Sequence, residues 1–204
     1  MKQRPRFYFS FRSPYSWIAA RMLEERSPTQ TLEYIPYWSP DAYTQQLLHA
    51  RGGTTLYVDM SKAKHLYILQ DIRRLTRKLG YQMAWPIDRD PWWDLPHLAY
   101  LHARSLGKGP EFFWAVHRSR WERAEDICSV AILRQLADET GIDADGLVAA
   151  PDDADIRAQG VDALYRAYND GVFGVPFFIH RFEKFWGVDR IEDFMTSLTQ
   201  GGLK

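Results

Sequence analysis

Two serines and a proline form the part of this chain best suited to hold an anion. The aromatic run at residues 6–11 predicts a short strand, and Ser13-Pro14-Tyr15-Ser16 follows it as the start of a helix. Proline is favoured at the first helical position, because its missing N–H would be unbonded there in any case. A helix N-terminus carries roughly half a positive elementary charge, so a hydroxyl at Ser13 lies where a phosphate, carboxylate or thiolate can bind. Ser13 also fits an ordinary N-cap, and both interpretations stand on these residues alone.

A second informative segment lies near the other end of the chain. Residues 171–179, GVFGVPFFI, join the end of a helix to a short apolar strand, with Pro176 at the start of the strand. The pattern that follows predicts a hairpin of strands at 177–180 and 183–186. Asp189 is then expected to cap a final amphipathic helix.

The hydrophobic pattern between these segments divides the chain. A helix from Pro14 and a second strand over 31–37 predict a right-handed parallel βαβ unit. Strand signals then vanish from about residue 41 to residue 155, where apolar residues recur at helical spacing. We therefore expect residues 41–155 to form a helical insertion, because the remaining strands come after it. Trp85, Trp92 and Trp93 within this insertion could line an apolar pocket, but aromatic residues at this density are more often core residues, which is the interpretation taken here.

Four segments together resemble a known family. SPYSW, KHLYILQDIRR, GVFGVPFF and FWGVDR resemble the DsbA-like branch of the thioredoxin superfamily. More narrowly, the chain is similar over nearly its whole length to the 2-hydroxychromene-2-carboxylate isomerases and the kappa-class glutathione transferases. The resemblance implies an α/β thioredoxin-like fold, with residues 1–40 and 156–204 as the thioredoxin-like domain and residues 41–155 as a large helical insertion. It also implies that the Val175–Pro176 peptide bond is cis and lies opposite the first helix.

The serines decide which chemistry is possible at this helix start. The superfamily carries Cys-x-x-Cys there, whereas this chain carries Ser13 and Ser16. Disulfide exchange needs a thiolate that attacks a sulfur atom, so redox chemistry of the DsbA kind is excluded at this site. The resemblance implies instead that a bound thiol is the nucleophile and that its thiolate accepts a hydrogen bond from Ser13. Such a bond is worth about 1.5–3 kcal/mol, enough to lower a thiol pKa by about one to two units.

The resemblance also assigns residues to the cofactor, which is expected to be glutathione or another low-molecular-weight thiol. The backbone of Val175, beside Pro176, would pair with the cysteinyl part of the thiol. Asp189 would receive the γ-glutamyl ammonium group, and Lys64 would border the peptide. Val188 stands where relatives commonly carry a polar side chain, so only its N–H can bind an α-carboxylate. The usual Asn in the loop before Lys64 has no clear counterpart in HARGGTTLY.

Composition agrees with a soluble, enzyme-sized domain, and the resemblance implies a small-molecule substrate. With 46% apolar and 15% aromatic residues, the 204-residue chain can bury a substantial core. Its 26 basic and 26 acidic residues are intermixed, which predicts neither a nucleic-acid nor an anionic-membrane partner. A single cysteine, Cys128, excludes a disulfide framework, and the histidines show no metal-ligand spacing, so no metal is expected. The chain lacks a long apolar run and a signal sequence, so a cytoplasmic protein is expected.

The most specific hypothesis is a thiol-dependent cis–trans isomerase. As the resemblance implies, a bound thiolate adds to an electron-poor double bond of a conjugated aromatic or polyene acid, the bond rotates, and the thiol leaves. Two alternatives stay open: a kappa-type glutathione transferase that stops at a stable adduct, and a non-catalytic binding protein whose thiol site has decayed. Val188 and the missing Asn favour the last alternative. Relatives are commonly homodimers, and the aromatic content leaves apolar surface to cover, so a homodimer is expected.

Overall fold

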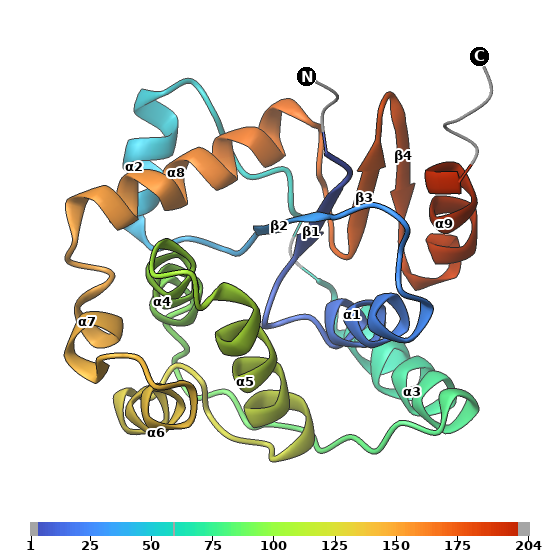
Figure 1. The fold of residues 1–204 in the computed structure, drawn as a ribbon, viewed down its shortest axis with the longest axis horizontal. Helices are drawn as coiled ribbons and strands as arrows, with labels where there is room; N and C mark the ends of the chain where they lie inside the picture. Colours follow the sequence, from blue (N-terminus) through green and yellow to red (C-terminus); the bar gives the residue numbers. More distant parts are fainter. Residues whose placement is uncertain (1–3, 59, 200–204) are drawn as a thin grey trace.

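The sheet joins strands from the two ends of the chain. The structure, a computed structural model, describes residues 4–58 and 60–199. Its strands are β1 (Arg6–Phe9), β2 (Glu33–Pro36), β3 (Phe177–His180) and β4 (Glu183–Trp186). They form one mixed sheet in the order β2-β1-β3-β4, with β2 parallel to β1, β3 antiparallel to β1 and β4 antiparallel to β3. In the middle of the sheet, β1 therefore pairs with β3, although most of the chain separates them (Figure 1).

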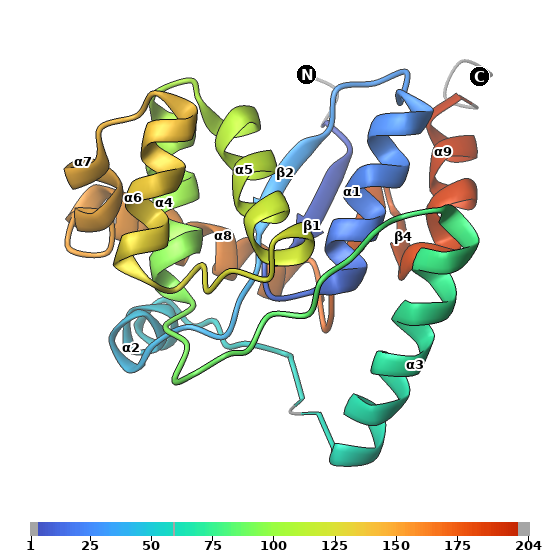
Figure 2. The same cartoon turned by 90° about the horizontal axis from the view of Figure 1, so that it is seen from below.

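Helices make up most of the remaining chain. They are α1 (Pro14–Arg26), α2 (Ala42–Ala50), α3 (Lys62–Leu79), α4 (Asp94–Ser105), α5 (Gly109–Glu122), α6 (Val130–Thr140), α7 (Ala144–Ala149), α8 (Ala154–Asn169) and α9 (Ile191–Thr199). Between β2 and β3, no described segment joins the sheet. Helices α4 to α7 gather on one side of the molecule, whereas α1, α3 and α9 lie on the other (Figure 1, Figure 2). Within the described ranges, no helix combines the length and the apolar character needed to cross a membrane.

The α/β class with a helical insertion, predicted from the sequence, is confirmed. Strands β1 and β2 are shorter than predicted, because β1 ends at Phe9 where the chain turns toward α1, and β2 covers only residues 33–36. Residues 1–3 and 200–204 of the expected thioredoxin-like domain lie outside the described residues.

One assignment is wrong, because Asp189 does not cap the final helix. Gly187 has a φ of 96°, and the Arg190 N–H closes a turn onto its carbonyl at 3.3 Å. This bond forms a 3-10 turn, η1 (Val188–Arg190), ahead of α9. Asp189 therefore lies inside that turn.

Aromatic residues of β1 form the centre of the core. Phe7, Tyr8 and Phe9 are fully buried, which explains why the strand is apolar on both faces instead of alternating with polar residues. The Phe7 ring stacks on the Phe178 ring of β3, with 5.0 Å between their centroids. Helix α1 buries Trp17 in the same core. Packing therefore fixes both the end of β1 and the first turn of α1.

Candidate active site

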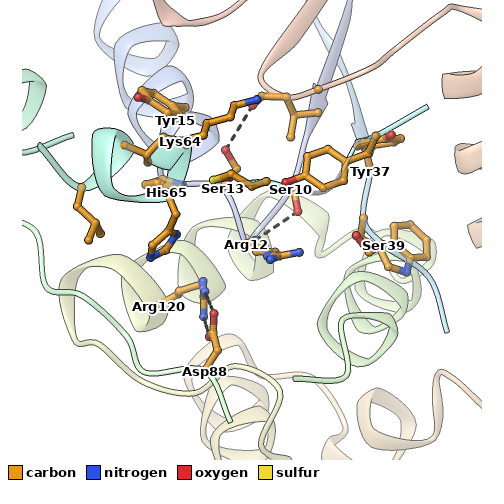
Figure 3. Close-up of a pocket in the computed structure, with 18 of the residues that line it drawn as sticks. Ser10, Arg12, Ser13, Tyr15, Tyr37, Ser39, Lys64, His65, Asp88 and Arg120 are labelled. Carbon is orange, nitrogen blue, oxygen red and sulfur yellow. Dashed lines mark hydrogen bonds and ion pairs between the residues drawn. The ribbon is translucent and has the colours of Figure 1, made fainter. Parts of the chain in front are cut away.

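Ser13 lies at the start of α1 and faces the segment that precedes β3. Its Oγ accepts a hydrogen bond from the Ser16 N–H at 3.2 Å, so Ser13 is the N-cap of the helix. The Ser16 Oγ in turn accepts the Ser10 N–H at 3.2 Å. The Ser13 hydroxyl also donates to the Val175 carbonyl at 3.4 Å, and this carbonyl belongs to the cis Val175–Pro176 peptide group (Figure 3). That contact is long for an O–H donor, so the proton is available to a closer acceptor.

The turn that presents Ser13, residues 10–13, is held by side chains of the helical insertion. The Phe11 N–H donates to His97 Nε2 of α4 at 3.1 Å. The Phe11 carbonyl accepts a hydrogen bond from Trp121 Nε1 of α5, also at 3.1 Å. A buried backbone group without a partner costs free energy. These two bonds therefore fix the Phe11 peptide groups, and with them the backbone of the turn that presents Ser13.

His97 acts as a neutral hydrogen-bonding group in the interior. The residue is inaccessible to solvent, and burial lowers its pKa to about 3. Nδ1 lies 2.6 Å from the Trp93 carbonyl, which can only accept, so Nδ1 carries the proton and Nε2 accepts from Phe11. The ring also stacks on Trp38, with 5.1 Å between centroids. The sequence gives no sign of this role for His97, because Phe11 and Trp38 reach the ring from other parts of the chain.

A cavity of about 730 Å³ opens in front of the Ser13 turn. Its lining is rich in aromatic residues, which include Tyr15, Tyr37, Trp38, Trp85, Trp121 and Trp186. A cavity of this size accepts a small organic molecule. Trp85 is 38% exposed and Trp92 is 40% exposed, so the core interpretation is wrong for both, whereas Trp93 is buried as expected. Trp85 lines the cavity, which agrees with the alternative of a pocket wall. Both exposed tryptophans lie in the irregular segment between α3 and α4, and part of each side chain stays open to solvent.

Positive charge dominates the polar groups of the cavity. Arg12, Lys64 and Arg73 line it, and no carboxylate pairs with any of them among the described residues. Asp88 is the only carboxylate in the described part of the lining. It accepts hydrogen bonds from both terminal nitrogens of Arg120, at 2.8 and 3.0 Å (Figure 3). The cavity therefore favours an anionic ligand with an aromatic body.

The structure brings together half of the site residues expected from the sequence. Those that line the cavity are Ser13, Lys64 and Val175. Pro176 is buried behind them, and Val188 packs against the hydrophobic core. The Asp189 carboxylate is 69% exposed, lies 3.6 Å from Arg190 and is not part of the described lining. The lining thus offers a hydrogen-bond donor for a thiolate and cations for a carboxylate. An ammonium group that binds Asp189 would have to lie outside the described lining.

Two other kinds of chemistry find no support in the described residues. Within residues 4–58 and 60–199, no group of three or more His, Cys, Asp or Glu side chains is placed to bind a metal ion. Cys128 is half-buried, and burial raises its thiol pKa to about 12. The thiol therefore stays protonated at neutral pH and is a poor nucleophile.

Comparison with known proteins assigns the chain to a family. Residues 6–199 match the DSBA-like thioredoxin domain. The chain is 28% identical over 195 residues to the 2-hydroxychromene-2-carboxylate isomerase of Sphingobium xenophagum, covering 94% of this chain and 95% of the relative. A solved structure of a 2-hydroxychromene-2-carboxylate isomerase has a TM-score of 0.77 at 18% identity, covering 97% of this chain and 95% of the other. The probable DsbA oxidoreductase SCO1869 of Streptomyces coelicolor has a TM-score of 0.70 at 20% identity, covering 98% and 91%. The chain therefore belongs to the family of DSBA-like thioredoxin domains.

Proposed function

We propose that this protein is a thiol-dependent cis–trans isomerase of a conjugated aromatic or polyene acid, in which Ser13 stabilises the cofactor thiolate. The position of the Ser13 hydroxyl carries the proposal, since it caps α1, points to the Val175 carbonyl and borders the cavity. The relationship to the isomerase of Sphingobium xenophagum supports the same type of reaction. Serine at both positions 13 and 16 argues against disulfide exchange, which needs a protein thiolate.

The proposed cofactor is glutathione or another low-molecular-weight thiol. When bound, it would supply a nucleophile that adds reversibly to the conjugated double bond and so allows rotation. Ser13 would donate a hydrogen bond to the sulfur, and the N-terminus of α1 would add its partial positive charge. Both interactions favour the thiolate over the thiol. The backbone of Val175 offers peptide groups for strand-like pairing, and Lys64 offers a cation to a carboxylate.

The rest of the cavity suits a planar conjugated acid. Trp85 and Trp121 form an apolar wall against which such a molecule can stack and from which it displaces water. Arg12 immediately precedes Ser13 and lines the same cavity. The two isomers have the same oxidation state, so these residues need no redox partner.

A second candidate is a non-catalytic binding protein. The packing of Val188 against the core and the position of Asp189 outside the described lining favour it, because both reduce the contacts available to glutathione. Such a protein would still bind an acid in the cavity but would not turn it over.

Product analysis separates these two candidates and also identifies a glutathione transferase. The protein is incubated with glutathione and 2-hydroxychromene-2-carboxylate or a cis-enoyl aromatic acid, and the products are followed by nuclear magnetic resonance. The isomerase forms the trans product and leaves glutathione unchanged, whereas a stable adduct would identify a transferase and the absence of both a binding protein. Ser13→Ala should lower turnover about a hundred-fold, as the loss of a preorganised donor to an anion does in other enzymes.

A further inference from the structure

Arg12 combines contact with an aromatic ring and the lack of a counter-ion. Its side chain is exposed at the cavity, and its guanidinium carbon lies 5.5 Å from the centre of the Trp93 ring. Among the described residues, no carboxylate forms an ion pair with it. A guanidinium in this state can bind a carboxylate through two parallel hydrogen bonds.

The carboxylate that shares the cavity lining with Arg12 is already engaged. Asp88 is the only carboxylate in the described lining, and Arg120 binds both of its oxygens, at 2.8 and 3.0 Å. The Arg120 side chain is only 3% exposed, and its guanidinium carbon lies 4.9 Å from the Trp93 ring and 4.7 Å from the Trp121 ring. Packing between two tryptophans holds Arg120 in place. Asp88 therefore remains with Arg120, and the charge of Arg12 stays available to a ligand.

We propose that Arg12 is the specificity-determining residue of an anion subsite that binds the carboxylate of an aromatic acid. The Arg120–Asp88 pair supports the subsite by keeping the only carboxylate of the described lining paired (Figure 3). The ring of the ligand lies against Trp85 and Trp121, whose rings meet edge to face at 6.1 Å. The inference rests on the proposed function for the identity of the substrate, but it concerns the binding of the acid alone.

Titration calorimetry without any thiol tests the subsite, with cinnamate and its neutral amide as probes. Wild-type protein should bind cinnamate at least about ten-fold more tightly than cinnamamide, the gain expected from a charge-assisted bidentate pair. Arg12→Gln should remove most of this preference, although Lys64 and Arg73 keep positive charge in the lining, and should leave the affinity for cinnamamide unchanged. Arg118→Gln is the matched control, because it removes an exposed arginine from the helix that carries Arg120 and should leave the preference intact.

Asp88→Asn should raise the affinity for cinnamate, whereas Arg12→Gln should lower it. Without its partner, Arg120 adds an uncompensated positive charge to the cavity, so cinnamate should bind several-fold more tightly. General damage to the fold cannot produce a gain in affinity, and thermal unfolding shows whether the variant is folded.

Three results would overturn the inference: no preference for cinnamate in the wild type, an intact preference in Arg12→Gln, or weaker cinnamate binding by folded Asp88→Asn. Thiolate formation beside Ser13 is measured separately, without acid. A failure of the subsite can therefore be distinguished from a failure of the proposed function.

Discussion

Replacing His97 with leucine would leave the Phe11 N–H without the acceptor that now lies 3.1 Å away. Both residues are fully buried, so water does not replace the lost bond. A buried donor without a partner costs about 1–3 kcal/mol, and the Trp93 carbonyl, 2.6 Å from Nδ1, loses its donor as well. Leucine has a volume close to that of histidine, so a cavity adds little. We expect the free energy of unfolding to fall by about 2–4 kcal/mol.

Urea unfolding of three proteins measures this effect. His97→Gln keeps an amide oxygen that can accept from Phe11, so it should lose less stability than His97→Leu. Because the Phe11 peptide belongs to the turn that presents Ser13, turnover at saturating thiol and acid should follow the same order. The reasoning is refuted if the leucine variant loses less than about 0.5 kcal/mol, the usual effect of a surface substitution, or if the two variants lose equal stability.

Three further predictions concern residues around the site. His117 is fully buried and neither ring nitrogen has a hydrogen-bond partner among the described residues, so His117→Leu should raise the free energy of unfolding by about 1–2 kcal/mol at neutral pH. Burial lowers the pKa of His117, so below a pH of about 6.5 the unfolded wild-type chain binds more protons than the folded one. The stability of the wild type therefore falls as the pH drops through this range. Urea unfolding should show that the stability advantage of His117→Leu grows in acid. Asp189→Asn should raise the KM for glutathione and leave kcat unchanged, since it removes binding common to the ground and transition states; an unchanged KM would exclude Asp189 from the cofactor site. Ser16→Ala removes the acceptor of the Ser10 N–H and should cost about 1 kcal/mol of stability, yet lower turnover in the same product assay far less than Ser13→Ala.

Features with a local signal could be predicted from the sequence. Ser13 followed by Pro14 marks the start of α1, and the structure shows Ser13 as its N-cap. The hairpin of β3 and β4 also has the predicted bounds. The cis Val175–Pro176 bond and its position opposite the first helix, where Val175 contacts Ser13, could be predicted only through the resemblance to a family.

Features that depend on distant residues could not be predicted. His97 and Trp121 bind the Phe11 peptide from 86 and 110 residues away, and neither residue has a distinctive neighbourhood in the sequence. The Arg120–Asp88 pair likewise joins α5 to an irregular segment 32 residues earlier. Such contacts depend on how the helical insertion packs against the sheet, and periodicity alone does not determine that packing.

The pKa of a thiol bound beside Ser13 tests the central claim most directly. The ultraviolet absorbance of the thiolate, followed against pH with glutathione bound, gives this pKa, and Cys128 does not interfere because burial raises its own pKa to about 12. In the wild type, the bound thiol should ionise about one to two pH units below the free thiol. Ser13→Ala should abolish most of that shift while lowering the free energy of unfolding by only about 1 kcal/mol. Equal thiol pKa values in the two proteins, with glutathione bound to both, would contradict the claim that Ser13 stabilises the thiolate.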